Sequence, residues 1–186
     1  MSEHIVSAYS EELERLSSDI MKMGGMVETM ITDASLALVS NDLELAKKVV
    51  ARDPLVDAIE SDAERQIVSL IARRQPMGHD LRMILSAMKI SSELERIGDL
   101  SKNIAKRTQR LDDHVNAEMR NAIMRMAQPV SRQLNNVLNA YAAGSADKAK
   151  AVWESDDDID NHYNLSLIHI SEPTRLRRIS YAVFCL

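Results

Sequence analysis

Two sets of oxygen-bearing side chains are the residues of this chain whose types and spacing could do chemistry. They recur at intervals of three or four residues in two separate stretches, and they are Asp57, Glu60 and Glu64, followed by Glu95, Asp99 and Asn103. In an α-helix such spacings place each set on one face. Like charges one turn apart repel each other and destabilise a helix slightly, so two such faces predict a bound cation between them. Carboxylate and amide oxygens suit Mg, Mn, Ca or Fe better than an ion that seeks thiolates.

No motif in the chain predicts catalysis. There is no nucleophile elbow, no Gly-rich phosphate loop and no Ser-His-Asp or Cys-His pattern. A carboxylate-bridged di-iron enzyme in a helical bundle would need Glu-x-x-His pairs, and the five His residues lie away from the candidate ligands. We therefore predict that the chain is not an enzyme.

The composition indicates an all-α protein in the cytoplasm. Aromatic residues make up only 3% of the 186 residues, while the 11 Met accompany many Leu, Ile, Val and Ala, which is typical of packed helices. A net charge of −5, without a basic patch, argues against nucleic acid or an anionic membrane as a partner. The N-terminal residues do not resemble a secretory signal, no apolar run is long enough for membrane insertion, and the single Cys185 favours a reducing compartment.

The elements that must position the candidate ligands are three long helices. The first is predicted at about residues 5–40, where apolar residues alternate at steps of four and three: Tyr9, Leu13, Leu16, Ile20, Met23, Val27, Met30 and Ala34. Gly24 and Gly25, in its middle, predict either a close helix contact or a bend. Asn41-Asp42 predicts a helix end followed by an N-cap.

The next two helices carry the acidic residues. A short helix is predicted to end at Asp53-Pro54, where Asp53 would cap a second long helix over about 54–74. A third helix is predicted over about 79–110, after a turn at 75–78. Its predicted buried seam is Met83, Ala87, Ile90, Leu94, Ile97, Ser101 and Ile104. The cations expected in solvent are Arg73, Arg74, Lys102, Lys106 and Arg107.

The pattern then starts again. A fourth helix is predicted over 115–143, with the seam Val115, Met119, Ile123, Met126, Val130, Val137 and Tyr141 and a kink at Pro129. Beyond it, residues match the first half at a constant offset of 103: Ala46 with Ala149, Lys47 with Lys150, Val49 with Val152, Asp53 with Asp156 and Asp57 with Asp160. The chain is therefore predicted to be an internal duplication.

Three segments together resemble the PhoU family, the phosphate-specific transport system accessory proteins. They are MKMGGMVETMI, RRQPMGHDLRMILSAMKISSELERIGDLSKNIAK and AKAVWESDDDIDNHYN, and the resemblance covers about residues 5–164. It implies two tandem three-helix bundles, each with acidic motifs that bind metal clusters. It also implies a negative regulator of the phosphate-starvation response, which acts with the ATPase subunit of the phosphate ABC transporter and with a sensor histidine kinase, and which forms a homodimer.

Carried over residue by residue, the family's ligands are matched by residues of both halves. The third-helix ligands fall on Glu95, Asp99 and Asn103, and the second-helix acids on Glu60 and Glu64. Asp57 is an additional candidate. Asp160, with Asn164, would begin a second site. The metal is expected to be divalent or trivalent, with Mg, Mn, Fe and Zn among the candidates.

The chain departs from the family after Asn164. A sixth helix with a second Glu-Arg-Ile-Gly-Asp motif is expected there, whereas the segment LSLIHISEPTR resembles a translated sequencing adapter. The predicted division is 1–112 as a first bundle, 113–164 as a partial second bundle and 165–186 as an artefactual tail. An incomplete second bundle would leave an apolar stripe uncovered, and such a stripe should bind an apolar dye.

Two functional interpretations other than an enzyme follow. The first is the cytoplasmic, metal-binding regulatory adaptor that the resemblance implies. The alternative is a structural helical dimerisation module, whose behaviour should not depend on metal. A chelator distinguishes the two.

Overall fold

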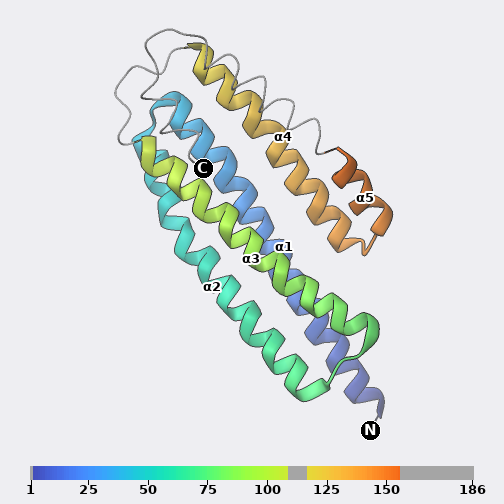
Figure 1. Ribbon diagram of the computed structural model, residues 1–186. Helices are drawn as coiled ribbons and strands as arrows, with labels where there is room; N and C mark the ends of the chain where they lie inside the picture. Colours follow the sequence, from blue (N-terminus) through green and yellow to red (C-terminus); the bar gives the residue numbers. More distant parts are fainter. Residues whose placement is uncertain (1, 109–116, 156–186) are drawn as a thin grey trace.

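The computed structural model describes residues 2–108 and 117–155, and the part of the chain that it describes is all-α, as predicted. The helices are α1 (Ser2–Ser40), α2 (Leu43–Arg74), α3 (Gly78–Thr108), α4 (Ala117–Ala142) and α5 (Ala146–Glu154). Helices α1, α2 and α3 form one long bundle, and α4 runs beside it (Figure 1). Asp160, Asn164, the proposed boundary at 112–113 and the proposed tail all lie outside the described residues.

Helix α1 is the element on which the others assemble. It packs against α2, α3 and α4, whereas α5 packs against α4. Six residues of its predicted seam are buried, and they are Leu16, Ile20, Met23, Val27, Met30 and Ala34. Tyr9 and Leu13 pack against this core from its edge. The heptad pattern therefore predicted the α1 seam correctly, because one stripe of α1 has to be apolar along the length of the bundle.

The predicted boundary at Asp53-Pro54 is wrong, because α2 continues from Leu43 to Arg74 with Pro54 inside it. Proline has no N–H to donate to the carbonyl of Val50, which weakens a helix locally. Packing compensates for the missing bond, since Val49 and Val56 on either side are fully buried. The predicted N-cap at Asp42 is confirmed: its Oδ1 accepts a hydrogen bond from the Leu45 N–H at 2.9 Å.

Four of the seven residues in the predicted seam of α3 lie one position before a buried residue. The buried residues are Ile84, Ala87, Ser91, Leu94, Gly98, Ser101, Ala105 and Thr108. Only Ala87, Leu94 and Ser101 belong to both sets, and Met83 is 44% exposed. Small residues on this stripe allow close packing: a Cβ on Gly98 would lie 3.4 Å from Cγ1 of Val56. The isoleucines, which are more hydrophobic, lie on a neighbouring stripe and are only partly buried.

Helix α4 packs against α1 through a close contact at Gly24. A Cβ on Gly24 would lie 2.5 Å from both Cδ atoms of Leu138, whereas a Cβ on Gly25 would meet nothing within 4 Å. Gly24 therefore marks a close helix contact. Part of the predicted α4 seam is again displaced, because Val130 and Val137 are 37% and 40% exposed. The buried residues of α4 are Ala122, Leu134, Leu138 and Ala140.

The turn between α1 and α2 is repeated between α4 and α5. Asn41 has a φ of +55° and Gly144, 103 positions later, a φ of +56°. The next residues, Asp42 and Ser145, both cap the following helix through a side-chain oxygen. This correspondence in backbone geometry supports the duplication that the sequence predicts. In the described residues, no helix is both long and apolar enough to cross a membrane.

Candidate metal centre

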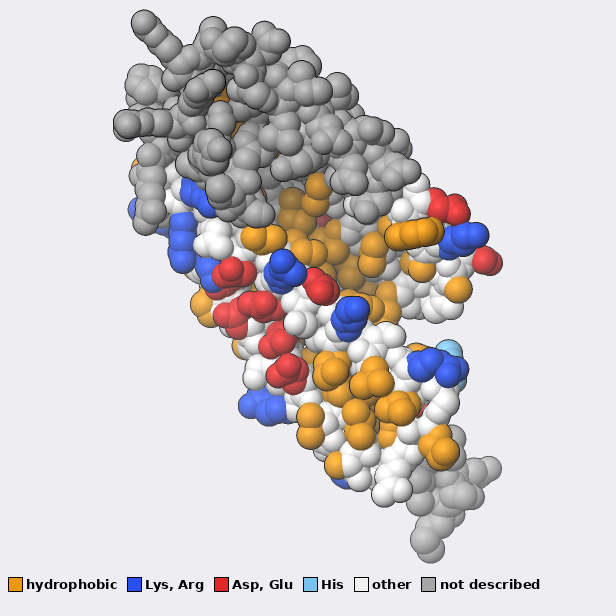
Figure 2. All heavy atoms as spheres, in the orientation of Figure 1, with side chains coloured by type: hydrophobic (Ala, Val, Ile, Leu, Met, Phe, Trp, Pro, Cys, Tyr) orange, Lys and Arg blue, Asp and Glu red, His pale blue; other side chains and the backbone are white. Residues whose placement is uncertain are grey.

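Neighbouring helices α2 and α3 bring the two predicted sets of oxygen ligands to one surface. We call this surface the acidic face, and it consists of Asp53, Asp57, Glu60, Glu64, Glu95, Asp99 and Asn103. Its electrostatic couplings join the two helices, since Glu60 on α2 interacts with Glu95 on α3, and Glu95 interacts with Asp57. Figure 2 shows acidic side chains gathered where α2 and α3 run side by side. The predicted juxtaposition of the first-bundle ligands is therefore present.

Burial and mutual repulsion disfavour ionisation of three carboxyl groups on the acidic face. Partial burial is the largest cause that raises the pKa of Asp57, Glu60 and Glu95 above their usual values. Neighbouring carboxylates raise each pKa further; for Glu60 these neighbours are Glu64, Glu95 and Asp57. A bound cation would relieve this repulsion.

Lys102 supplies a positive charge within the acidic face. Its Nζ lies 2.7 Å from Oδ2 of Asp53 on α2 and 2.5 Å from Oδ1 of Asp99 on α3. The Lys102 side chain is only 19% exposed, so the expectation that it lies in solvent is wrong. The hydrogen bond to Asp53 is the largest cause that raises the pKa of this ammonium group, and the hydrogen bond to Asp99 is the second. Arg74 also departs from the expectation, because its partly buried guanidinium binds Glu12.

The sequence did not predict the ion pair between Asp53 and Lys102. Asp53 was predicted to cap a helix, and it is instead a buried residue inside α2. The spacing of Lys102, three residues after Asp99, was the available signal for an ion pair within α3. Nothing in the spacing of residues 53 and 102 indicates a contact across helices, because that contact depends on how α2 and α3 pack.

Asp99 is the most fully paired carboxylate of the predicted ligands. Oδ1 accepts from Lys102, and Oδ2 accepts from Nδ2 of Asn103 at 3.1 Å. The Lys102 hydrogen bond is the largest cause that holds the pKa of Asp99 below its usual value, and Asn103 and Lys106 act in the same direction. Asp99 is therefore the ligand that would have to exchange an existing partner for a metal.

The oxygen donors of the acidic face suit a hard cation, although they do not point to a common position where an ion could bind. Six carboxylates share the surface with the Lys102 ammonium, and their oxygens are the ligands that Mg and Mn prefer. In the described residues, however, no three acidic, His or Cys side chains form a group ready to hold an ion. A metal would need side-chain rotations at the ends of Glu60, Glu64 and Glu95.

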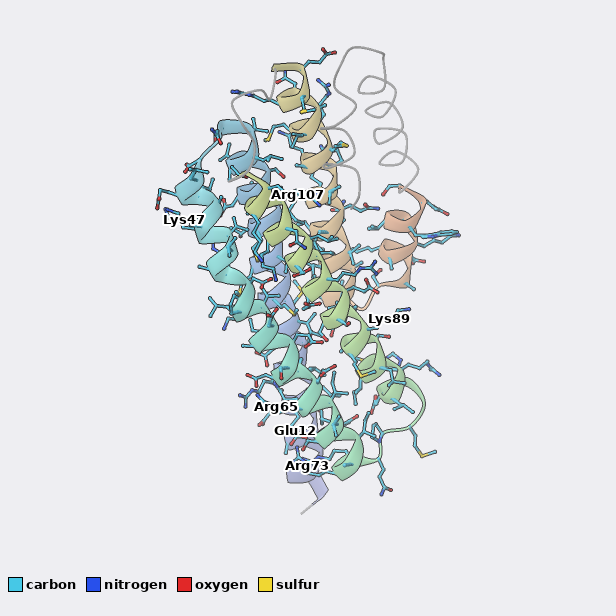
Figure 3. The ribbon with its side chains drawn as sticks, turned by 60° about the vertical axis from the view of Figure 1, so that its left-hand side comes forward. Glu12, Lys47, Arg65, Arg73, Lys89 and Arg107 are labelled. Atoms are coloured by element: carbon cyan, nitrogen blue, oxygen red, sulfur yellow. The ribbon has the colours of Figure 1, made fainter. Side chains whose placement is uncertain are left out.

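A second charged contact fastens α1 to α2 at the far end of the bundle. Glu12 on α1 accepts from Arg74, with Nε to Oε2 at 3.2 Å, and pairs with Arg73, with Nη1 to Oε1 at 3.2 Å. The Arg74 hydrogen bond is the largest cause that lowers the pKa of Glu12. Figure 3 shows Glu12 and Arg73 at the same end of the bundle. Glu12, Arg73 and Arg74 thus pair with one another, which favours a structural role for them.

An apolar groove of about 820 Å³ lies between α3 and α4. Residues of both predicted seams line it: the isoleucines of α3 that the sequence predicted to be buried, and part of the predicted seam of α4. Its apolar lining on these helices includes Ile90, Ile97, Leu100, Ile104, Ile123, Met126, Val130 and Val137. Figure 2 shows apolar side chains in this hollow. The groove lies between the two halves of the chain rather than within the second half.

Comparison with known proteins identifies the family. The model of the PhoU domain matches twice, at residues 20–108 and 123–185. The chain belongs to the PhoU family. The two PhoU matches begin 103 residues apart, which agrees with the internal duplication. The second match extends into residues 165–185, and the artefactual origin of this tail stays a prediction.

Several PhoU relatives are similar over most of this chain. The phosphate-specific transport system accessory protein PhoU homolog of Caulobacter vibrioides is 43% identical over 166 residues, which cover 88% of this chain and 72% of that protein. The homolog of Rhizobium meliloti is 38% identical over 192 residues, covering 98% of this chain and 79% of the relative. These relatives therefore contain residues beyond the part that this chain matches.

Two solved PhoU structures share the fold. The crystal structure of PhoU from Pseudomonas aeruginosa aligns with a TM-score of 0.84 at 31% identity, covering 94% of this chain and 83% of the other. The phosphate transport system regulatory protein PhoU from Streptococcus pneumoniae aligns with a TM-score of 0.75 at 30% identity, covering 87% and 76%. The helical arrangement that we describe is thus that of the PhoU family.

Proposed function

We propose that this chain is a cytoplasmic regulator of phosphate transport that binds metal at its acidic face. The observation that carries the metal proposal is the joining of six carboxylates from α2 and α3 on one surface, where burial and repulsion raise the pKa of three of them. The regulatory proposal rests on PhoU family membership and on relatives named as accessory and regulatory proteins of phosphate transport.

In the proposed mechanism, carboxylates of α2 and α3 would hold a metal together, and this shared binding would stiffen the first bundle. Carboxylates from two helices that share one cation can no longer separate without losing a ligand, so the bound state holds the helices in a fixed relation. The stiffened bundle then presents a constant surface to the ATPase subunit of the phosphate transporter and to the sensor histidine kinase. Through these contacts the chain would act as a negative regulator of the phosphate-starvation response, as a homodimer.

The alternative is a helical dimerisation module that requires no metal. The apolar groove between α3 and α4 favours this reading, since uncovered apolar surface promotes association. The two proposals differ in their response to a chelator, which should leave a purely structural module unchanged.

Metal binding is tested on the full chain with a Glu95→Ala/Asp99→Ala double variant. We expect the wild type to bind Mn²⁺ in calorimetric titration and to gain thermal stability, and the variant to lose both effects. A Glu93→Ala/Glu154→Ala variant removes the same charge from exposed positions outside the acidic face and should behave as wild type. Equal binding by wild type and Glu95→Ala/Asp99→Ala would reduce the acidic face to a solvated surface.

A further inference from the structure

The acidic face has two ends that differ in their resident positive charge. At one end, Lys102 pairs with Asp53 and Asp99. At the other end are Glu60, Glu64 and Glu95, and among the described residues no Lys or Arg forms an ion pair with these carboxylates. The neighbours that act on Glu60 are all carboxylates, whereas Lys102 acts on Asp57 and Glu95. The positive charge of Lys102 therefore acts directly on Asp53 and Asp99, reaches Glu95 only as the smallest cause of its pKa shift, and does not act on Glu60.

Lys102 makes the contacts across helices that a bound cation would make. Its Nζ joins α2 to α3 through two carboxylates, and the Asp53 side chain is only 8% exposed. A buried carboxylate without a partner is strongly destabilising, so Asp53 needs this ammonium group when no other cation is present. The ammonium also engages one oxygen of each carboxylate that a metal would otherwise use.

We propose that Lys102 is the built-in cation of the Asp53–Asp99 end and confines metal to the Glu60, Glu64 and Glu95 end of the acidic face. This inference rests on the proposed metal binding. A divalent ion at Asp99 would lie beside the fixed ammonium, and two positive charges a few ångströms apart repel each other strongly in a partly buried site. Lys102 is thus a positioning residue that decides where, and how many, ions bind.

The experiment is to replace Lys102 by Met, which keeps the length and the apolar stem of the side chain and removes its charge. We expect Lys102→Met to bind an additional Mn²⁺ per chain in calorimetric titration. We also expect its melting temperature to differ between chelator and saturating Mn²⁺ by about 5 °C more than that of the wild type. In chelator alone the variant should be less stable than the wild type, because Asp53 has lost its partner.

Two further variants make the result specific. Lys106→Met removes the same charge one turn along α3. Among the described residues Lys106 forms no ion pair, and it acts on Asp99 through its charge but not through a hydrogen bond, so this variant should keep the wild-type stoichiometry. Asp53→Asn/Lys102→Met removes the buried unpaired charge. It should recover stability in chelator and still bind the added ion through Asp57 and Asp99.

The outcomes separate this inference from the proposed function. Equal Mn²⁺ stoichiometry and an equal stability gain in wild type and Lys102→Met overturn the inference and leave metal binding intact. Mn²⁺ binding by Lys102→Met but not by wild type contradicts both, because the inference requires the wild type to bind metal at the Glu60, Glu64 and Glu95 end. No binding by either protein contradicts both. If Lys102→Met is unfolded in chelator, folding on addition of Mn²⁺ supports the inference, and failure to fold overturns it.

Discussion

At the scale of single residues, the acidic face is arranged at a cost to the stability of the metal-free protein. A carboxyl group whose pKa is higher in the folded than in the unfolded chain favours folding while it is protonated. This contribution is fully present below the ordinary pKa, 4.5 for Glu60 and Glu95, and it is lost as the pH rises through the raised value. Asp99 and Glu12 have lowered pKa values and act in the opposite sense, losing their contribution only at lower pH.

Glu95→Gln should therefore stabilise the protein without metal. An uncharged amide cannot take part in the repulsion, so we expect the melting temperature in chelator at pH 7 to rise by about 1–3 °C. We also expect the melting temperature of the variant to fall less steeply than that of the wild type as the pH rises above 4.5, the ordinary pKa of the Glu95 carboxyl group. In saturating Mn²⁺ the sign should reverse, because a ligand is lost. The control is Glu93→Gln, an exposed position on the same helix. A destabilised Glu95→Gln protein in chelator would show that Glu95 has a favourable partner.

At the scale of the helices, the sequence determined where the elements lie better than which stripe of each is buried. The α1 seam could be predicted because one stripe of that helix is strongly apolar. In α3, two adjacent stripes satisfy the same spacing, and the isoleucines made the wrong one more hydrophobic. Close packing selected the stripe with Ser91, Gly98 and Ala105 instead. Which stripe of α3 is buried depends on the shape of the helices that pack against it, and the local sequence of α3 carries no information about that shape.

The same limit applies to the candidate site. Spacing along α2 and α3 was sufficient to place the carboxylates on common faces, and packing brought those faces together. The pairing of Asp53 with Lys102 was not predictable, because Pro54 indicated a helix boundary and a capping role for Asp53. Packing of Val49 and Val56 overrode that local signal and left Asp53 inside the bundle.

The two adjacent glycines of α1 should respond to the same substitution with opposite signs. Gly24→Ala places a methyl group against Leu138, and we expect it to destabilise the protein by about 1–3 kcal/mol through overpacking. Gly25→Ala meets open space and should stabilise it by ~0.5–1 kcal/mol through improved helix propensity. Urea unfolding measures both. A stability gain in both variants would mean that α4 can move away from α1 at little cost.

At the scale of the whole molecule, two surfaces of different character share α3. The acidic face lies on its α2 side, and the apolar groove lies on its α4 side. Helix α3 therefore separates a polar site from an apolar one, and each depends on a different neighbour. The groove provides a physical basis for the predicted binding of an apolar dye, because four residues of the α4 seam predicted to be uncovered line it, together with residues of α3: Ile123, Met126, Val130 and Val137.

We expect the groove to increase the fluorescence of an apolar dye such as anilinonaphthalene sulfonate. Val130→Lys places a charge in the groove, at a side chain that is already 37% exposed. It should lower dye fluorescence while changing the free energy of unfolding by no more than about 0.5 kcal/mol. Val68→Lys, at a 65% exposed position on α2, is the matched control and should leave dye binding unchanged. Wild-type protein that fails to bind the dye would contradict an accessible groove.

The two surfaces of α3 also differ in how much chain must be synthesised before they can exist. The described acidic face uses residues 53–103 of the neighbouring helices α2 and α3, whereas the groove needs α4 as far as Leu138. Proteins are synthesised from the N-terminus, and the N-terminal parts generally fold first. The acidic face can therefore meet the ions of its surroundings while α4 has yet to leave the ribosome, before the apolar groove has its second wall.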